Sequence, residues 1–455
     1  MTATPSVLRN RWSFAIGTIG RDMVYGLVSM FLIVFITDAV HVSNWTLGLL
    51  MGLILAVRLL DAVGDFAIGA LVDNTRTRWG PYKPWIAIGM LVSASATVLL
   101  FTDFGLREGA FVLAFTLLYI VWSFSFSAND IPYWSFVQAL TTNQKERERI
   151  SSLAKIFATI GLFSVVVGII PVTAALGGGV RAWTLFAVGV VVVMILGQLV
   201  TLVGVDQRQL IVPERHVRPR EVFDAVRKND QLLWTAISMV LFQTGYVTTT
   251  TFGPYFFKYI YGDAAMYTPF GAILGVGMVL GFLLFPLARR RFSRRQLYTG
   301  SMAVIVAGYL IFFFAPMNMI VLSVCGLMLF IGDSFIVILM IGFITDCVDY
   351  GQWKLGVRSG AVTFAVQPFI NKVGGALSTA IVGITLIFTG VNGASGPADL
   401  SPGGVWGVKL MMLQFPAVLI VISYLIYRRK FVIDERLHAQ IVSELRDRGQ
   451  LQEQG

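Results

Sequence analysis

The sequence predicts an all-α integral membrane protein with about twelve transmembrane helices. Of its 455 residues, 56% are hydrophobic and only 13% are charged, and the mean hydropathy is +0.75. Soluble domains carry about 25% charged residues. Long apolar segments also recur along the whole chain, each close to the roughly 20 residues that a helix needs to cross a bilayer. The chain is therefore expected to lie mostly within a membrane.

The apolar segments form two sets of six. The first set lies at 12–37, 44–72, 83–103, 109–139, 150–175 and 182–204, and the second at 232–260, 266–288, 296–315, 318–348, 361–391 and 405–427. The predicted domains are a first six-helix bundle (1–205), a polar central linker (206–231), a second six-helix bundle (232–427) and a polar tail (428–455). Two six-helix halves joined by a cytoplasmic linker are typical of the major-facilitator fold.

Basic residues predict the orientation, because they cluster in alternate loops. The clustered residues are Arg76, Arg78, Lys83, Lys145, Arg147, Arg149, Arg289, Arg290, Arg291, Arg294 and Arg295, with Arg208, Arg215, Arg218, Arg220, Arg227 and Lys228 in the linker. The positive-inside rule then places both termini and the linker in the cytoplasm of a cell (inner) membrane protein. The net charge of +10 is thus a topology signal, and a nucleic-acid-binding role is not expected. No removable signal peptide is expected before the first span.

Ionisable residues inside the predicted spans indicate a solute pathway, since each is costly there unless it is paired or faces an aqueous cavity. These residues are Arg21, Asp22, Arg58, Asp61, Asp65, Asp130, Lys155 and Lys372. Asp61 and Asp65 are four residues apart and share one helix face, where either a metal ion such as Na⁺ or a bound proton would reduce their repulsion. Purely structural pairing is the alternative, within the group at Arg58, or between the other acids and their basic neighbours.

Several separated blocks resemble the glycoside-pentoside-hexuronide:cation symporter family, and within it the melibiose permeases. The blocks are 20–22 (GRD), 58–65 (RLLDAVGD), 74–85 (NTRTRWGPYKPW), 130–135 (DIPYWS), 146–149 (ERER), 346–351 (DCVDYG), Gln367 and 372–375 (KVGG). They occur in the family's order over nearly the whole chain, so the set is far more specific than any one block.

The resemblance implies a role for each residue of a sugar site and a cation site. The implied sugar contacts are Arg21, Asp22, Asp130, Trp134, Lys155, Gln367 and Lys372. The acids would accept hydrogen bonds from sugar hydroxyls, the basic groups would donate, and Trp134 would lie against the apolar ring face. Trp134 taken alone is equally well explained as a packing residue. The implied cation ligands, metal ligands if the ion is Na⁺, are Asp61, Asp65 and Ser127.

Four positions depart from the melibiose permease pattern. Gly64 replaces an asparagine between the two cation-site aspartates, which removes one oxygen ligand and favours H⁺ slightly over Na⁺. Lys155 replaces an arginine and lacks its planar fork. Val337 and Phe126 replace a tryptophan and a tyrosine. A glycoside remains the expected substrate, whereas a uronide is less favoured because Asp22 and Asp130 would repel its carboxylate.

The sequence therefore predicts a secondary symporter that imports a galactoside-like or other small sugar with a monovalent cation by alternating access. We expect a monomer, no cofactor and no enzymatic activity. No Gly-x-x-x-x-Gly-Lys-Ser/Thr loop occurs in the sequence, which argues against an ATP-driven pump. The histidines (His41, His216, His438) fall in predicted loops or tails, and Cys325 and Cys347 are expected to be buried. A glycoside sensor that does not transport, and a lipid or amphiphile transporter on the same fold, are the alternatives.

Overall fold

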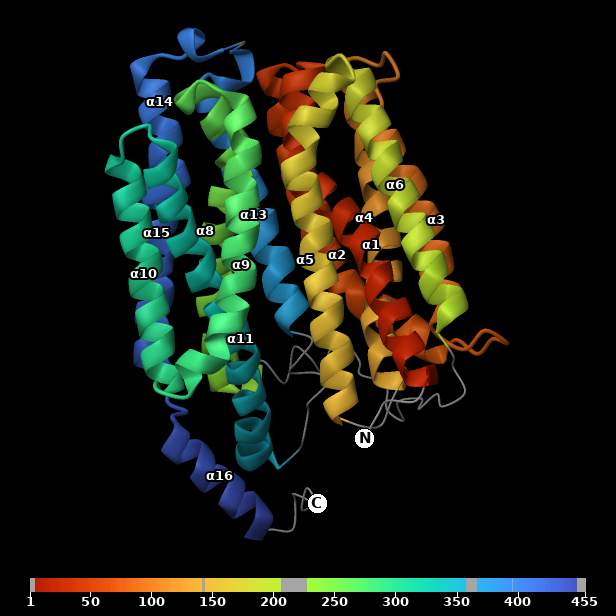
Figure 1. Ribbon diagram of the computed structural model, residues 1–455, viewed down its shortest axis with the longest axis vertical. Helices are drawn as coiled ribbons and strands as arrows, with labels where there is room; N and C mark the ends of the chain where they lie inside the picture. The colour runs from red at the N-terminus through yellow and green to blue at the C-terminus, as the bar shows by residue number, and fades with distance from the viewer. Residues whose placement is uncertain (1–4, 141–143, 206–226, 357–365, 395, 448–455) are drawn as a thin grey trace. The chain divides into compact units, whose positions relative to one another are not determined.

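The computed structural model describes residues 5–140, 144–205, 227–356, 366–394 and 396–447. Within these ranges all regular structure is helical (Figure 1). The long helices of the first part are α1 (Pro5–Val34), α2 (Asn44–Asn74), α3 (Lys83–Leu100), α4 (Glu108–Leu140), α5 (Gln144–Ala175) and α6 (Gly179–Gly204). Those of the second part are α8 (Asp230–Tyr255), α9 (Tyr267–Arg289), α10 (Arg294–Phe314), α11 (Met319–Leu355), α13 (Val366–Phe388), α15 (Phe415–Lys430) and α16 (Glu435–Asp447).

Eleven helices of the described residues are long and apolar enough to cross a membrane. They coincide with eleven of the predicted spans. The other predicted span, 232–260, is also helical, as α8 followed by a π-helix at Phe256–Tyr261. It is not among the eleven, and its threonine run, Thr248 to Thr251, makes it more polar. The prediction of a multi-pass, all-α membrane protein is confirmed, while the count of twelve spans stays a prediction.

The chain divides into two compact units. The first comprises Met1–His216, Thr250–Gly275 and Thr379–Val408, and the second comprises Val217–Thr249, Val276–Ser378 and Lys409–Gly455. Most of the predicted central linker, 206–226, lies outside the described residues. The predicted bundle bounds of 1–205 and 232–427 stay a prediction.

In the first unit α1 packs directly on α5 and α6, and glycines permit the close approach. A Cβ added at Gly20 would lie 2.2 Å from Cα of Met194 in α6, and one added at Gly161 in α5 would lie 2.1 Å from the carbonyl oxygen of Ile19. Both distances are shorter than real Cβ contacts, so only glycine fits at these crossings. Small residues at such crossings are typical of membrane helix packing.

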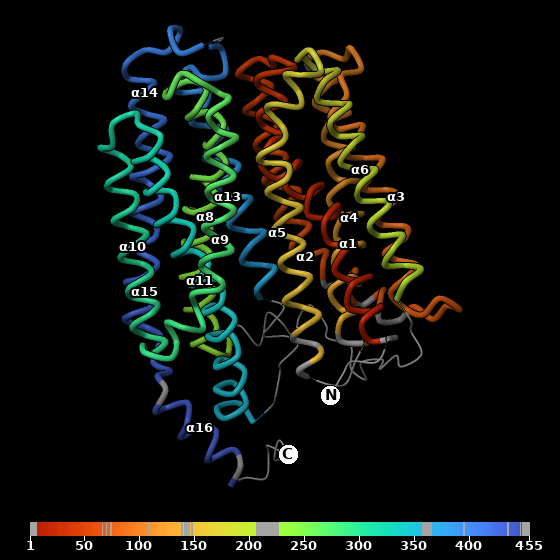
Figure 2. Tube along the Cα trace, viewed as in Figure 1, coloured from red at the N-terminus to blue at the C-terminus, as the bar shows by residue number. Residues whose placement is uncertain are grey.

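In the second unit α16 lies against α11 (Figure 2). Ile441 and Leu445 of α16 are fully buried, and the indole of Trp353 donates a hydrogen bond of 2.7 Å to Oε2 of Glu444. The predicted tail therefore contains a docked amphipathic helix.

A histidine in this helix faces two acids. Nε2 of His438 lies 3.1 Å from Oδ2 of Asp349 and 3.6 Å from Oδ1 of Asp346, and Arg294 also pairs with Asp346. The hydrogen bond to Asp349 and the charge of Asp346 raise the pKa of His438 above its ordinary value, against burial and the charge of Arg294. The protonated imidazole is therefore the form that stabilises the docked helix.

Candidate functional site

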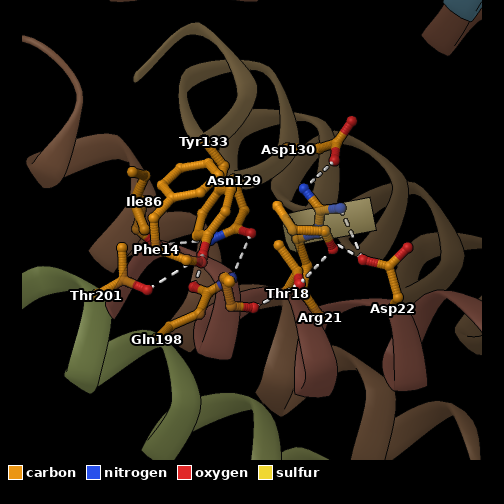
Figure 3. A network of polar contacts seen from close by, with 12 residues as sticks. Phe14, Thr18, Arg21, Asp22, Ile86, Asn129, Asp130, Tyr133, Gln198 and Thr201 are labelled. Carbon is orange, nitrogen blue, oxygen red and sulfur yellow. Dashed lines mark hydrogen bonds and ion pairs between the residues drawn. The ribbon is translucent and has the colours of Figure 1, made fainter. Parts of the chain in front are cut away.

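Arg21 joins the two acids of the predicted sugar site (Figure 3). Its side chain is 3% exposed. Nε and Nη2 donate to Oδ2 of Asp22 at 3.1 and 2.7 Å, while Nη1 lies 2.8 Å from Oδ1 of Asp130 in α4. The contact with Asp130 is an ion pair that lacks the alignment of a hydrogen bond. One buried guanidinium thus compensates part of the charge of two carboxylates from different helices.

The backbone just before Arg21 is held against two helices, α6 and α5. Gly20, one residue before it, makes the close contact with α6 described above. Thr18, one turn earlier, donates from Oγ1 to the carbonyl of Ala154 in α5 at 3.0 Å. Because Lys155 directly follows Ala154, this hydrogen bond also sets the position of Lys155 along the axis of α5 relative to Arg21. Local packing therefore positions both basic groups of the site.

A buried amide pair holds the helix that carries Asp130. Asn129 and Gln198 of α6 exchange two hydrogen bonds of 2.8 Å, and Nδ2 of Asn129 also donates to the carbonyl of Ile86 in α3 at 2.8 Å. Both amide side chains are fully buried, and Figure 3 shows them beside the ion pairs. Unpaired amides would be costly at this depth, so the pair fixes the rotation of α4 next to Asp130.

The next turn of α4 is held in the same way. The hydroxyl of Tyr133 donates to the carbonyl of Phe14 at 2.5 Å and lies 3.1 Å from Oγ1 of Thr201. No motif in the sequence predicts a role for the side chains of Asn129, Gln198 or Tyr133. Uncharged polar residues within apolar spans are the signal that marks such interhelical contacts.

Both cations of the site contact the ring of Trp134. The guanidinium carbon of Arg21 is 4.9 Å from the ring centroid, and Nζ of Lys155 is 4.7 Å from it. Such contacts are cation–π interactions and stabilise a positive charge over the ring. A sugar can stack on Trp134 only on the area that these cations leave, or after displacing the amine of Lys155, which is the more exposed of the two residues.

Asp130 is the accessible acceptor of the cluster. Its side chain is 38% exposed, against 20% for Asp22. Oδ1 faces Arg21, and Oδ2 makes no hydrogen bond with a described residue. A carboxylate oxygen that is exposed but held in place by its partner oxygen is suited to accept a hydroxyl hydrogen bond from a ligand.

The structure joins two of the three predicted cation ligands. Oγ of Ser127 in α4 donates to Oδ1 of Asp61 in α2 at 3.0 Å, and Asp61 is only 5% exposed. Asp65 follows one helical turn later and is half-buried. Within the described residues no group of three or more His, Cys, Asp or Glu side chains is arranged to hold a metal.

Gly64 faces an aromatic ring. A Cβ added there would lie 2.7 Å from Cε1 of Phe124 in α4. The asparagine found at this position in melibiose permeases would therefore collide with Phe124 unless the ring moved. Gly64 and Phe124 together keep this side of the predicted cation site closed to a further side-chain ligand.

Arg58 contacts an aromatic residue of α4, whereas the alternative interpretation expected pairing with Asp61 and Asp65. Its Nε donates to the hydroxyl of Tyr119 in α4 at 2.8 Å. Phe126, at another position that departs from the family pattern, stacks on Tyr25 and Trp122 with centroid distances of 5.8 and 5.4 Å. These residues form an aromatic wall between α1 and α4 rather than part of the ion-pair cluster.

Gln367 and Lys372 lie in α13 and belong to the second unit. Both side chains are half-buried. Near them, Gly374 packs against Gln243 of α8, where an added Cβ would lie 2.8 Å from that side chain. The predicted contribution of Gln367 and Lys372 to the sugar site stays a prediction.

Comparison with protein families supports a transport role. A family model described as MFS/sugar transport protein matches residues 13–435. The lactose permease of Lactobacillus helveticus is 32% identical over 460 residues, which cover 96% of this chain and 71% of that permease. The raffinose carrier protein of Pediococcus pentosaceus is 29% identical over 459 residues, with the same two coverages.

Solved structures support the fold. A structure from work on substrate recognition in proton-dependent oligopeptide transporters superposes with a TM-score of 0.67 at 12% identity, over 96% of this chain and 100% of that one. The nucleoside transporter NupG gives a TM-score of 0.64 at 14% identity, over 93% and 100%. At these identities the likeness concerns the fold alone, and it confirms the predicted all-α major-facilitator fold.

Proposed function

Because this chain belongs to the MFS/sugar transport protein family, we propose that it imports a glycoside of the galactoside kind together with a monovalent cation. The predicted membership among the glycoside-pentoside-hexuronide:cation symporters is confirmed by the family match and the relatives. The protein is a multi-pass membrane transporter and not an enzyme. Lactose and raffinose, which name two of its relatives, both carry a terminal galactose, and this supports a galactoside as substrate.

The observation that carries the proposal is the cluster of Arg21, Asp22, Asp130, Trp134 and Lys155. It offers two carboxylates, two cations and an indole within one compact unit. A sugar presents adjacent hydroxyls and an apolar ring face. The charged groups can form hydrogen bonds with the hydroxyls, and the indole can contact the ring face. An apolar lipid tail forms no hydrogen bonds with carboxylates, so the cluster argues against the amphiphile transporter.

The two predicted sites are joined by one helix. Ser127, which bonds Asp61, and Asp130, which pairs with Arg21, are three residues apart in α4 and so lie on the same face. A cation at Asp61 that changes the hydrogen bond to Ser127 acts one helical turn from the sugar acceptor. Coupling of the two binding free energies needs such a shared element, and it is reciprocal.

For the coupling ion we favour H⁺ slightly over Na⁺. A hard cation of this size needs about 6 oxygen ligands, whereas the described site offers Asp61, Asp65 and Ser127 with Gly64 and Phe124 closing one side. A proton needs one carboxyl only. Water or backbone carbonyls completing a Na⁺ shell would reverse this preference.

The proposal includes an orientation and an oligomeric state. The basic loops support cytoplasmic termini in the cell (inner) membrane. The monomer is the proposed functional unit.

The test is uptake of labelled lactose and raffinose into vesicles that contain the purified protein, with and without imposed H⁺ or Na⁺ gradients. Uphill uptake driven by an ion gradient is expected, and a glucuronide should be taken up poorly because of Asp22 and Asp130. Binding without uptake would support the glycoside sensor instead. Sodium-dependent uptake that resists a protonophore would refute the H⁺ assignment and leave symport intact.

A further inference from the structure

A second carboxylate lies deep in the other compact unit, outside every motif described above. Asp333 is the fifteenth residue of α11, about 21 Å from the start of the helix at 1.5 Å per residue. It is 2% exposed. Both the depth along the helix and the burial place this acid well inside the membrane-spanning part.

The groups around Asp333 in the described part of the chain include a hydrogen-bond donor, and no cation pairs with it there. The hydroxyl of Tyr246 in α8 donates to the carboxylate, and the phenol of Tyr309 in α10 is the second titratable group that faces it. That phenol already pairs with Oγ1 of Thr249 at 2.8 Å. Within the described residues no Lys or Arg forms an ion pair with Asp333, and its Oδ1 has no hydrogen-bond partner.

The other described residues that contact this turn of α11 in the structure are apolar or uncharged. α10 presents Ile305 to Gly332, and α9 presents Gly281 and the carbonyl of Met278 to Ser334. Phe330 packs on Tyr246 with a centroid distance of 5.5 Å. None of these groups can balance a negative charge.

This environment favours the neutral acid. An isolated carboxylate moved into a low-dielectric interior loses several kcal/mol of solvation, whereas a hydrogen bond to a charged group returns only about 1.5–3 kcal/mol. Asp22 and Asp130 differ from Asp333 in this respect, because Arg21 contacts both. A buried acid without a cation resolves the imbalance by taking up a proton.

We propose that Asp333 is a proton-binding site of the second unit, occupied by a proton in the conformation described here. Binding converts the carboxylate to a carboxylic acid and consumes one proton from water. Release returns that proton to water when a movement of α8 against α11 hydrates the carboxyl. Its part in transport rests on the proposed symport function, whereas the protonation itself does not.

The test is infrared spectroscopy of the full-length protein in lipid, because a protonated carboxyl has a carbonyl stretch distinct from that of a carboxylate. The difference spectrum between wild type and Asp333→Asn at neutral pH should contain a carboxylic-acid band. The band should diminish as the pH is raised well above neutrality. Asp130→Asn is the matched control, because the carboxyl of Asp130 is exposed and ion-paired. This variant should retain the carboxylic-acid band of Asp333.

Tyr246→Phe provides a second reading that does not depend on how Asp333→Asn folds. Loss of the donated hydrogen bond should shift the frequency of the same band while the band remains. A difference spectrum without a carboxylic-acid band, or a band that Tyr246→Phe leaves unmoved, would overturn the proposal. A protein that gives the band but takes up no sugar would contradict the proposed function and leave the proton site standing.

Discussion

Replacing Asp130 by asparagine is expected to remove most of the sugar affinity while leaving the fold intact. The change keeps the shape and an acceptor oxygen near Arg21, and Arg21 retains both hydrogen bonds to Asp22. Because Asp130 is 38% exposed and Asp22 still pairs with Arg21, the buried guanidinium keeps a counter-ion and the fold should tolerate the change. The variant should therefore insert and unfold almost as the wild type does.

The affinity loss follows from the hydrogen bonds to the ligand. A bond to a charged acceptor contributes about 1.5–3 kcal/mol and a neutral one about 0.5–1.5 kcal/mol. If Asp130 accepts from two sugar hydroxyls, the difference sums to about 2–3 kcal/mol, or roughly 30- to 150-fold in Kd. Calorimetric titration of the purified variant with a transported sugar measures this directly.

Two further measurements complete the experiment. Asp103→Asn removes a carboxylate that pairs with Arg107 outside the cluster, so it should leave the sugar affinity unchanged. Thermal unfolding in detergent reports whether Asp130→Asn is folded. A folded Asp130→Asn variant that binds sugar within about threefold of wild type would exclude Asp130 from the site.

Three other predictions follow from the structure. Gly64→Asn alone should impair transport, because the new side chain meets Phe124. The double variant Gly64→Asn with Phe124→Ala should instead gain sodium-stimulated uptake. Equal sodium responses in the two variants would contradict this reasoning. A cysteine at Phe292, which is exposed and avoids the N-cap at Ser293, should react with a membrane-impermeant thiol reagent only from the cytoplasm, while labelling from outside would reverse the topology. Because the pKa of His438 is raised in the folded state, its contribution to docking of α16 is fully present below its unfolded value of ~6.5. That contribution is lost as the pH rises through the raised value, so hydrogen exchange in α16 should accelerate with pH beyond the intrinsic rate; an unchanged acceleration in His438→Gln would refute the role of the imidazole.

The sequence predicted the features that depend on composition and local spacing. Apolar segment length placed the spans, and the motif blocks selected Arg21, Asp22 and Asp130, which the structure brings into contact. The pairing of Asp61 with Ser127 across α2 and α4 was likewise implied by the family resemblance. Charged residues in an apolar span are conspicuous, and this explains why reasoning from the sequence found them.

The features that the sequence did not predict depend on which helix faces lie together. Asn129 and Gln198 are separated by 69 residues, and neither belongs to a charged motif, so their pairing is visible only in three dimensions. Asp333 differs, because nothing in its flanking sequence indicates that its Oδ1 has no hydrogen-bond partner among the described residues. The contact between Gly64 and Phe124 depends on how α2 and α4 are rotated about their axes, which the sequence does not reveal.

The glycine contacts of α1 have a consequence for how affinity is distributed between the two sides of the membrane. At Gly20 and Gly161 backbone meets backbone, so α1, α5 and α6 cannot slide past one another without a clash. Interfaces packed this closely move as rigid bodies in domain rearrangements. Arg21 and Lys155 should then keep one separation throughout the transport cycle. In the proposed alternating-access cycle, a difference in sugar affinity between the outward- and inward-open forms would consequently arise from groups outside this rigid set.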